Sequence, residues 1–183
     1  MIHATGESSL NRRNFLATAA AAGAAACSHS TNEPWRTLTS AEARTLNAWC
    51  DCLIPEDADA GAVRAGVARY IDIQLTKKFK RHRKAYERVL AAINVQARRA
   101  YSRDFADAPL DARTAMLEEF EKGPDKAAFN MILDHTLQGY YGNPRHGGNV
   151  EYASWRMLGV TPVPVRGRRQ YSILESASKG GQS

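Results

Sequence analysis

The chain has 183 residues, 44% of them hydrophobic, and a formal net charge of +6. This length fits one domain of ordinary size that can bury a real core. The alanine-rich run at residues 15–26 is well short of the roughly 20 apolar residues that a transmembrane helix needs, so we do not expect it to span a membrane.

The first residues are typical of an export signal. Arg12 and Arg13 are followed almost at once by Phe15 and Leu16, and then by the alanine-rich run. Paired arginines before a weakly apolar core fit the bacterial twin-arginine pattern better than the general secretory one. We therefore expect residues 1–27 to be a twin-arginine signal peptide read by the twin-arginine translocase, which would place the protein in the periplasm.

The end of this signal leaves two processing routes open. Ala24, Ala25 and Ala26 form a small-residue cleavage motif, while Cys27 directly after them stands where a lipoprotein carries its lipidated cysteine. A lipoprotein signal usually has a leucine three residues before that cysteine, and Ala24 stands there instead. Lipidation of Cys27 would tether the chain to the membrane surface.

The next segment leads into the first predicted helix. Residues 28–38 are polar and include a proline, so we interpret them as a linker, and we expect a helical domain over residues 39–165. Thr39 and Glu42 have the spacing of a capping box. The helix that starts there ends at Leu53, because the residue before a proline disfavours helical dihedrals.

A turn and a second helix follow. Asp57, Asp59 and Gly61 resemble the start of a calcium loop, but Ala68 stands where the closing glutamate belongs, which favours a structural turn. From Ala62 onward, side chains that would share one helix face recur at Val63, Val67, Tyr70, Ile71, Gln74 and Leu75.

The third and longest predicted helix, residues 80–105, lies in a basic stretch. Its apolar face is formed by Tyr86, Val89, Leu90, Ile93, Ala97 and Tyr101. The cations are Lys77, Lys78, Lys80, Arg81, Arg83, Lys84, Arg88, Arg98, Arg99 and Arg103. Export argues against nucleic-acid binding, and a solvated helix face is favoured; an acidic partner or an anionic lipid surface is the alternative.

Two further helices complete the predicted fold. Asp111 looks like the N-cap of a short helix through Met116, Leu117 and Phe120, and a fifth helix runs from Asp125 to about Gly139. No alternating strand pattern is present. The predicted fold class is all-α, an irregular orthogonal bundle of about five helices with a Gly/Pro-rich aromatic C-terminal loop, and residues 166–183 are expected to be a flexible tail.

The cysteines and histidines offer little chemistry. Cys50 and Cys52 are two residues apart on a helix and point to different sides of it, so we expect at least one to be a small buried side chain. Asp134 and His135 also face different directions. His146 is the better acid–base candidate, but it has no identifiable partner. We predict no catalytic, cofactor-binding or metal-binding residue in this chain.

The most specific pattern lies near the C-terminus. Residues 138–149 read Gln-Gly-Tyr-Tyr-Gly-Asn-Pro-Arg-His-Gly-Gly-Asn, and residues 155–159 read Trp-Arg-Met-Leu-Gly. These runs resemble the C-terminal signature of the gluconate 2-dehydrogenase subunit 3 family, and the resemblance covers roughly residues 38–162. The motif and expected partner interface are Gly139, Tyr140, Tyr141, Pro144, Gly147, Gly148, Asn149, Trp155, Arg156, Met157 and Gly159.

This resemblance implies a small accessory chain of a periplasmic, membrane-associated dehydrogenase. The expected partners are an FAD-dependent catalytic subunit of the glucose–methanol–choline type and a multihaem cytochrome c, so FAD and haem c would be held by the partners. The implied role is maturation, export and assembly of the flavoprotein. The alternative is a stand-alone exported lipoprotein that binds a small ligand or metal near Tyr141, Arg145 and His146.

Overall fold

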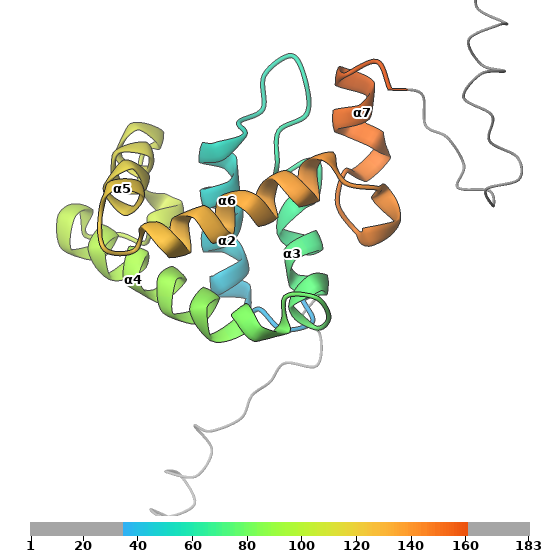
Figure 1. Cartoon of the computed structure of the whole chain (residues 1–183). Helices are drawn as coiled ribbons and strands as arrows, with labels where there is room; N and C mark the ends of the chain where they lie inside the picture. Colours follow the sequence, from blue (N-terminus) through green and yellow to red (C-terminus); the bar gives the residue numbers. More distant parts are fainter. Residues whose placement is uncertain (1–34, 161–183) are drawn as a thin grey trace, which may run out of the picture. The chain divides into compact units, whose positions relative to one another are not determined.

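The computed structural model describes residues 35–160, which contain six α-helices and no strand. The all-α prediction is therefore confirmed. In the numbering of Figure 1, the helices are α2 (Ser40–Leu53), α3 (Val67–Leu75), α4 (Arg83–Tyr101), α5 (Leu110–Lys122), α6 (Lys126–Tyr141) and α7 (Ala153–Met157). The 3-10 turns between them are η1 (Lys80–His82), η2 (Phe105–Asp107), η3 (Pro144–His146) and η4 (Val150–Tyr152).

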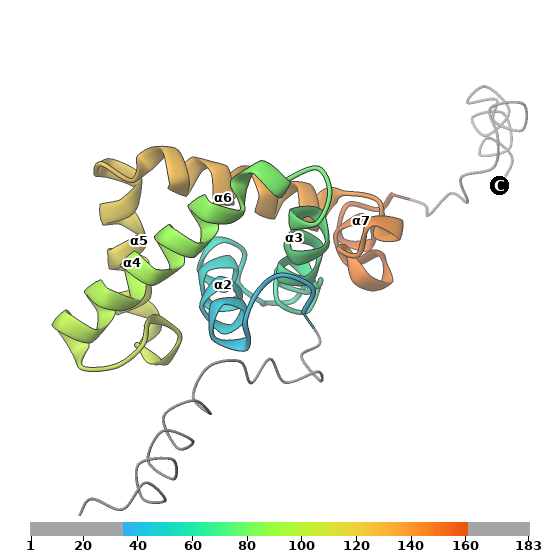
Figure 2. The same cartoon turned by 90° about the horizontal axis from the view of Figure 1, so that it is seen from below.

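Helix α2 is the central element, because it packs against α3, α4, α5 and α6. Helix α3 returns beside it in the opposite direction, and α6 crosses both (Figure 1). Seen from below, α2 and α3 are viewed nearly end-on, with α4 and α6 running across them (Figure 2). The predicted bundle of crossing helices is thus present.

The centre of the core is aromatic. Trp49 on α2 is fully buried, and its ring lies 5.6 Å from that of Phe120 and 6.2 Å from those of Phe105 and Phe129. Tilted and edge-to-face ring pairs of this kind add about 0.5–1.5 kcal/mol each to the gain from burial. One tryptophan therefore joins α2 to η2, α5 and α6.

The first helix begins as the sequence predicts. The Glu42 backbone N–H donates to Thr39 Oγ1 at 3.2 Å, and the Thr39 backbone N–H donates to Glu42 Oε2 at 2.8 Å, which completes the capping box. The ordered chain starts earlier than Thr39, however. The backbone N–H groups of residues 36–38 all donate to the buried carboxylate of Asp72, so at least this end of the predicted linker belongs to the domain.

Helix α3 starts five residues later than predicted. Residues 62–65 form a separate turn, which Gly66 ends with a φ of 72°. A side chain at Gly66 would be strained there and would also meet Val150 Cγ2 at 2.8 Å. Val63 therefore lies outside the helix and is exposed, although its spacing suggested the buried face.

Two other predicted boundaries are wrong. Helix α4 ends at Tyr101, because Ser102 adopts a left-handed conformation and the chain turns back to bury Phe105; Tyr101 itself is exposed. Helix α5 begins directly after Pro109, which is its N-cap, so Asp111 lies in the first turn instead of capping it. A carboxylate in that turn still interacts favourably with the helix dipole.

Several predictions fall outside the described residues. These are the signal residues Arg12, Arg13, Phe15 and Leu16, the lipidation site Cys27, most of the linker and the tail from residue 166. Among residues 35–160, no helix combines the length and apolar character needed to cross a membrane.

Candidate interaction site at the C-terminal motif

The C-terminal motif, residues 139–159, begins where α6 packs closely on α3. Gly139 is buried against this neighbour, and a Cβ there would lie 2.8 Å from Tyr70 Cδ1 and 3.2 Å from Val67 Cγ1. Glycine is thus required at this position for the two helices to approach. The side chain of Tyr140 follows, almost completely buried, and donates from its hydroxyl to the Ala60 carbonyl at 2.7 Å.

The paired glycines hold the returning chain against the same helix pair. A Cβ on Gly148 would collide with the Gly139 carbonyl oxygen, which belongs to backbone and cannot rotate away. Gly147 has a φ of 99°, and a Cβ there would lie 2.6 Å from Ile73 Cδ1. The Val150 backbone N–H then donates to the Ala65 carbonyl at 3.1 Å, which fastens the motif to the start of α3.

Asn149 and Ser154 connect the two halves of the motif from inside. Asn149 is fully buried; its amide donates to the Gly142 carbonyl at 2.9 Å and its Oδ1 accepts from the Ser154 backbone N–H at 2.9 Å. The Ser154 hydroxyl donates to the Tyr140 carbonyl at 2.6 Å. These bonds satisfy carbonyls at the end of α6 and orient α7.

The backbone between the halves is strained. Asn149, Glu151 and Tyr152 have φ values of 47°, 55° and 60°, which are three of the four positive values found for non-glycine residues in the described chain. Each left-handed residue of this kind costs about 1 kcal/mol or more, and such strain gathers where function requires a particular shape.

The motif presents apolar and aromatic side chains on its outer side. Six of the eleven large hydrophobic residues exposed in the described chain lie within residues 141–160. Trp155 is half-buried beside them; its Nε1 donates to the Tyr141 carbonyl at 2.9 Å and its ring lies 5.7 Å from that of Tyr152. We call this set the apolar end surface: Tyr141, Val150, Tyr152, Trp155, Met157, Leu158 and Val160.

The residues expected at a partner interface therefore divide into two groups. Gly139, Tyr140, Gly148 and Asn149 are buried, and Gly147 and Pro144 are partly buried, so they shape the motif from within. The exposed or half-buried ones are Tyr141, Trp155, Arg156, Met157 and Gly159. Leu158 and Tyr152 belong with the second group, and they could have been found as apolar residues beside the motif's tryptophan.

A small cleft of about 260 Å³ lies beside the motif, between the 58–64 turn and the η4–α7 segment. Its lining includes Asp59, Arg64, Glu151 and Arg156, two acids and two bases. The turn forms as the sequence favours, with the Asp59 backbone N–H donating to Asp57 Oδ1 at 2.9 Å. A lining of balanced charge suits polar contacts to a partner more than capture of a strongly charged ligand.

The histidine of interest in the structure is His135, not His146. His135 is buried, stacks on Phe79 with 3.6 Å between ring centroids, and its Nδ1 lies 2.9 Å from the Tyr86 hydroxyl. The pKa of His135 is lowered to about 4, chiefly by burial and to a lesser extent by the nearby His82, Lys78 and Arg81. Its spacing of three residues from Ile132 already indicates the buried face of α6.

His135 and Tyr86 form an uncharged pair in the core. Burial also raises the pKa of the Tyr86 hydroxyl well above its usual value, so neither ring of the pair holds a charge at neutral pH. Asp134 is exposed, which confirms that it and His135 face different sides. His146 is exposed and lies 3.1 Å from Arg145 Nε, and no group of three metal-ligating side chains occurs in residues 35–160.

The cysteines match their predicted role. Cys50 is completely buried, burial raises the pKa of its thiol to about 12, and its Sγ lies 3.5 Å from Thr136 Oγ1. Cys52 is half-buried, and both thiols are free. The prediction of at least one small buried cysteine is confirmed.

Comparison with known proteins gives one match. A family model described as gluconate 2-dehydrogenase subunit 3 matches residues 40–162, which span α2 to α7 and the whole C-terminal motif. No curated protein matches the chain. No solved structure matches it either.

Proposed function

Because the chain belongs to the gluconate 2-dehydrogenase subunit 3 family, we propose that it is a non-catalytic accessory subunit that binds an FAD-dependent catalytic subunit through the apolar end surface. Membership in this family implies association with a gluconate 2-dehydrogenase complex as an accessory subunit. The proposal adds the type of partner and the surface that contacts it.

The observation that carries the proposal is the construction of the C-terminal motif. Buried glycines and the Asn149–Ser154 bonds fix a short, strained segment whose outward side chains have no apolar cover within the described chain. Rigid aromatic side chains with a polar handle, such as Tyr152 and Trp155, are typical anchors of protein interfaces. A surface whose shape is maintained at a cost in backbone strain is expected to have a role in binding.

We further propose that residues 1–27 are a twin-arginine signal that takes the folded flavoprotein to the periplasm together with this subunit. In the proposed complex, FAD belongs to the catalytic subunit, and a multihaem cytochrome c carries the electrons onward. The paired arginines before a weakly apolar run support this proposal, because the twin-arginine route carries folded proteins and a flavoprotein must be folded to hold its cofactor. Lipidation of Cys27 would add a membrane anchor to the same assembly.

The contact is tested with matched leucine variants. Leu158 on the apolar end surface is 57% exposed and Leu110 at the start of α5 is 52% exposed, so aspartate should harm the fold little at either position. The tagged chain is co-expressed with a candidate FAD-dependent catalytic subunit of the glucose–methanol–choline type and purified, and bound flavin is read by absorbance. Leu158→Asp should weaken flavoprotein binding about tenfold or more, as the loss of an interface anchor does.

The Leu110→Asp variant should retain the flavin absorbance of the unchanged chain. If Leu110→Asp lost the flavoprotein while Leu158→Asp kept it, the contact would lie elsewhere on the subunit. A colourless, partner-free product from the unchanged chain would overturn the proposed flavoprotein partner itself.

A further inference from the structure

The most strongly charged surface of the described chain extends from the turn between α3 and α4 into the first turns of α4. Six exposed cations fall within twelve consecutive residues there. We call this surface the basic corner; it consists of Lys77, Lys78, Lys80, Arg81, Lys84 and Arg88. Solvation of a helix face explains single charges of this kind, but not the concentration of six cations within twelve residues.

These cations have almost no neutralising partners. Glu87 is the one acidic residue of the stretch, and Arg83 already engages it at 2.9 Å as well as Glu42 at 3.3 Å. Within residues 35–160, the side chains of Lys77, Lys80, Lys84 and Arg88 form no hydrogen bond or ion pair, and the Lys78 ammonium donates only to the neutral Gln138 side chain. Mutual repulsion in such a cluster is relieved by an external anion.

The chain segment that forms the basic corner contains no exposed large apolar side chain. Among the described residues, no exposed large hydrophobic side chain lies between Val63 and Val95. Protein interfaces are enriched in aromatic residues and arginine and depleted in lysine, whereas four of these six cations are lysines. Clusters of four to eight lysines and arginines are instead typical of surfaces that bind anionic lipids.

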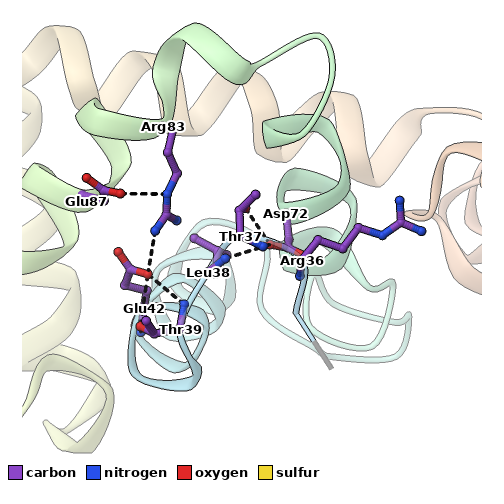
Figure 3. A network of polar contacts seen from close by, with 8 residues as sticks. All are labelled: Arg36, Thr37, Leu38, Thr39, Glu42, Asp72, Arg83 and Glu87. Atoms are coloured by element: carbon purple, nitrogen blue, oxygen red, sulfur yellow. Dashed lines mark hydrogen bonds and ion pairs between the residues drawn. The ribbon is translucent and has the colours of Figure 1, made fainter. Parts of the chain in front are cut away.

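The basic corner also lies where the chain enters the domain. Asp72, near the end of α3, binds the backbone of residues 36–38, and Arg83 at the start of α4 reaches Glu42 at the start of α2 (Figure 3). Cys27 precedes Trp35 by eight residues, a distance that extended chain covers in at most about 28 Å. Membrane attachment at Cys27 would therefore keep this end of the domain within about 28 Å of the bilayer.

We propose that the basic corner binds the headgroups of anionic phospholipids and holds this end of the domain against the membrane surface. The statement that the basic corner faces a membrane rests on the proposed export and membrane location of the protein. The charge complementarity between this corner and anionic headgroups rests on the described residues alone. The binding is electrostatic, so it is reversible and weakens as salt screens the charges.

The test is sedimentation of the full chain with vesicles of phosphatidylcholine alone and of phosphatidylcholine mixed with phosphatidylglycerol. The patch variant carries Lys77→Gln, Lys80→Gln, Lys84→Gln and Arg88→Gln. The control variant carries Arg99→Gln, Arg103→Gln, Lys122→Gln and Lys126→Gln. These four exposed cations lie in the last turn of α4, just after α4, at the end of α5 and at the start of α6. Both variants lose four charges and keep residues 1–34, so any contribution of the leader cancels.

The unchanged chain should bind the phosphatidylglycerol vesicles more tightly than the neutral ones, and binding should fall as salt rises from about 0.05 M to 0.3 M. The patch variant should bind the anionic vesicles about tenfold more weakly or worse, since each lysine near the surface contributes substantially. The control variant should bind nearly as tightly as the unchanged chain. Circular dichroism checks that both variants are folded.

Three results would overturn the inference. One is equal binding to neutral and anionic vesicles by the unchanged chain. Another is equal loss of binding in the patch and control variants, which would make net charge the cause. The third is loss of the flavoprotein by the patch variant with lipid binding unchanged, which would assign the corner to an acidic protein. Since no dehydrogenase subunit takes part in the vesicle assay, its failure is distinguishable from failure of the proposed function.

Discussion

Asp72 is a single residue that decides where the ordered domain begins. Its carboxylate is buried and accepts four hydrogen bonds at 2.6–2.9 Å, from the backbone N–H groups of Arg36, Thr37 and Leu38 and from the Thr37 hydroxyl (Figure 3). Charge-assisted bonds of this kind are roughly twice as strong as neutral ones. They convert the last residues of an apparent linker into part of the fold.

Replacing Asp72 should therefore be costly. Asp72→Ala is expected to lower the free energy of unfolding by about 2–4 kcal/mol, because it leaves backbone donors without an acceptor. Urea unfolding measures the loss, and hydrogen exchange should show residues 36–38 newly unprotected. Asp134→Ala, at an exposed position on α6, is the control and should change stability by no more than about 0.5 kcal/mol. Unchanged protection at residues 36–38 in Asp72→Ala would contradict the role of the carboxylate.

His135 should make the fold sensitive to acid. Its pKa is about 4 in the folded chain against an ordinary value of 6.5, chiefly because it is buried. Between these two values the unfolded chain binds more protons than the folded one, so stability falls as the pH is lowered through this window. This group should contribute no further loss below about pH 4.

The expected loss across that window is on the order of 2 kcal/mol. It is measured as the free energy of urea unfolding at several pH values. His135→Phe preserves a flat ring against Phe79 and should reduce the slope between pH 6.5 and 4. His146→Phe, at an exposed position, is the control and should leave this slope unchanged. An unaltered slope in His135→Phe would assign the acid sensitivity to other groups.

At the scale of elements, the molecule depends on the close approach of α6 and the returning chain to α3. Gly139 lets α6 lie against Tyr70, and Gly148 brings the motif backbone onto the Gly139 carbonyl. Packing of this kind sets the direction in which η4 and α7 leave the helix bundle. The position of the apolar end surface therefore depends on Gly139 and Gly148, which are not part of that surface.

Gly148→Ala should disturb this packing severely. The added methyl group would meet the Gly139 carbonyl oxygen and Tyr70 Cβ, neither of which can rotate away, so a loss of about 2 kcal/mol or more in unfolding free energy is expected. Gly159→Ala is the control: nothing lies within 4 Å of its added methyl, and only its φ of 67° opposes the change. The Gly159→Ala variant should lose about 1 kcal/mol of unfolding free energy. Equal melting temperatures for the two variants would argue against the tight packing.

At the scale of the whole molecule, the two proposed surfaces lie at opposite ends of α3. The Val150–Ala65 hydrogen bond holds the C-terminal motif at the start of this helix, whereas the basic corner follows its end (Figure 1). A helix of nine residues separates them by roughly 14 Å. A domain that rests on the membrane through the basic corner would thus keep the apolar end surface free for its partner.

In the proposed complex, export is a property of the whole assembly. Changing Arg12 and Arg13 to lysines should leave both this chain and its flavoprotein partner in the cytoplasm, because twin-arginine recognition requires the arginine pair. Cell fractionation followed by a flavin-dependent activity assay measures the distribution of both proteins. Replacing Arg98 and Arg99 by lysines, the matched control, should leave export normal. A partner that still reached the periplasm normally would exclude the carrier role, although the accessory-subunit role could stand.

The sequence by itself determined the all-α class, five of the six helices and the family motif. Each of these depends on neighbours along the chain: the Thr39–Glu42 capping box, the proline after Ile54, the helical spacing of Tyr86, Val89 and Ile93, and the run from Gln138 to Gly159. Local signals of this kind are complete within one or two turns of helix, so the folded context adds little to them.

Only the tertiary structure decided which motif residues are scaffold and which are surface. Gly139 is packed by Tyr70 and Asp72 binds residues 36–38, partners 69 and about 35 positions away in sequence. Spacing shows which residues share a helix face, but what covers that face depends on how distant segments meet. Helical spacing also indicated that Asp134 and His135 face different sides, and the sequence showed the basic stretch. The exposure of Leu158 and the lack of side-chain partners for Lys77, Lys80, Lys84 and Arg88 came only from the tertiary structure.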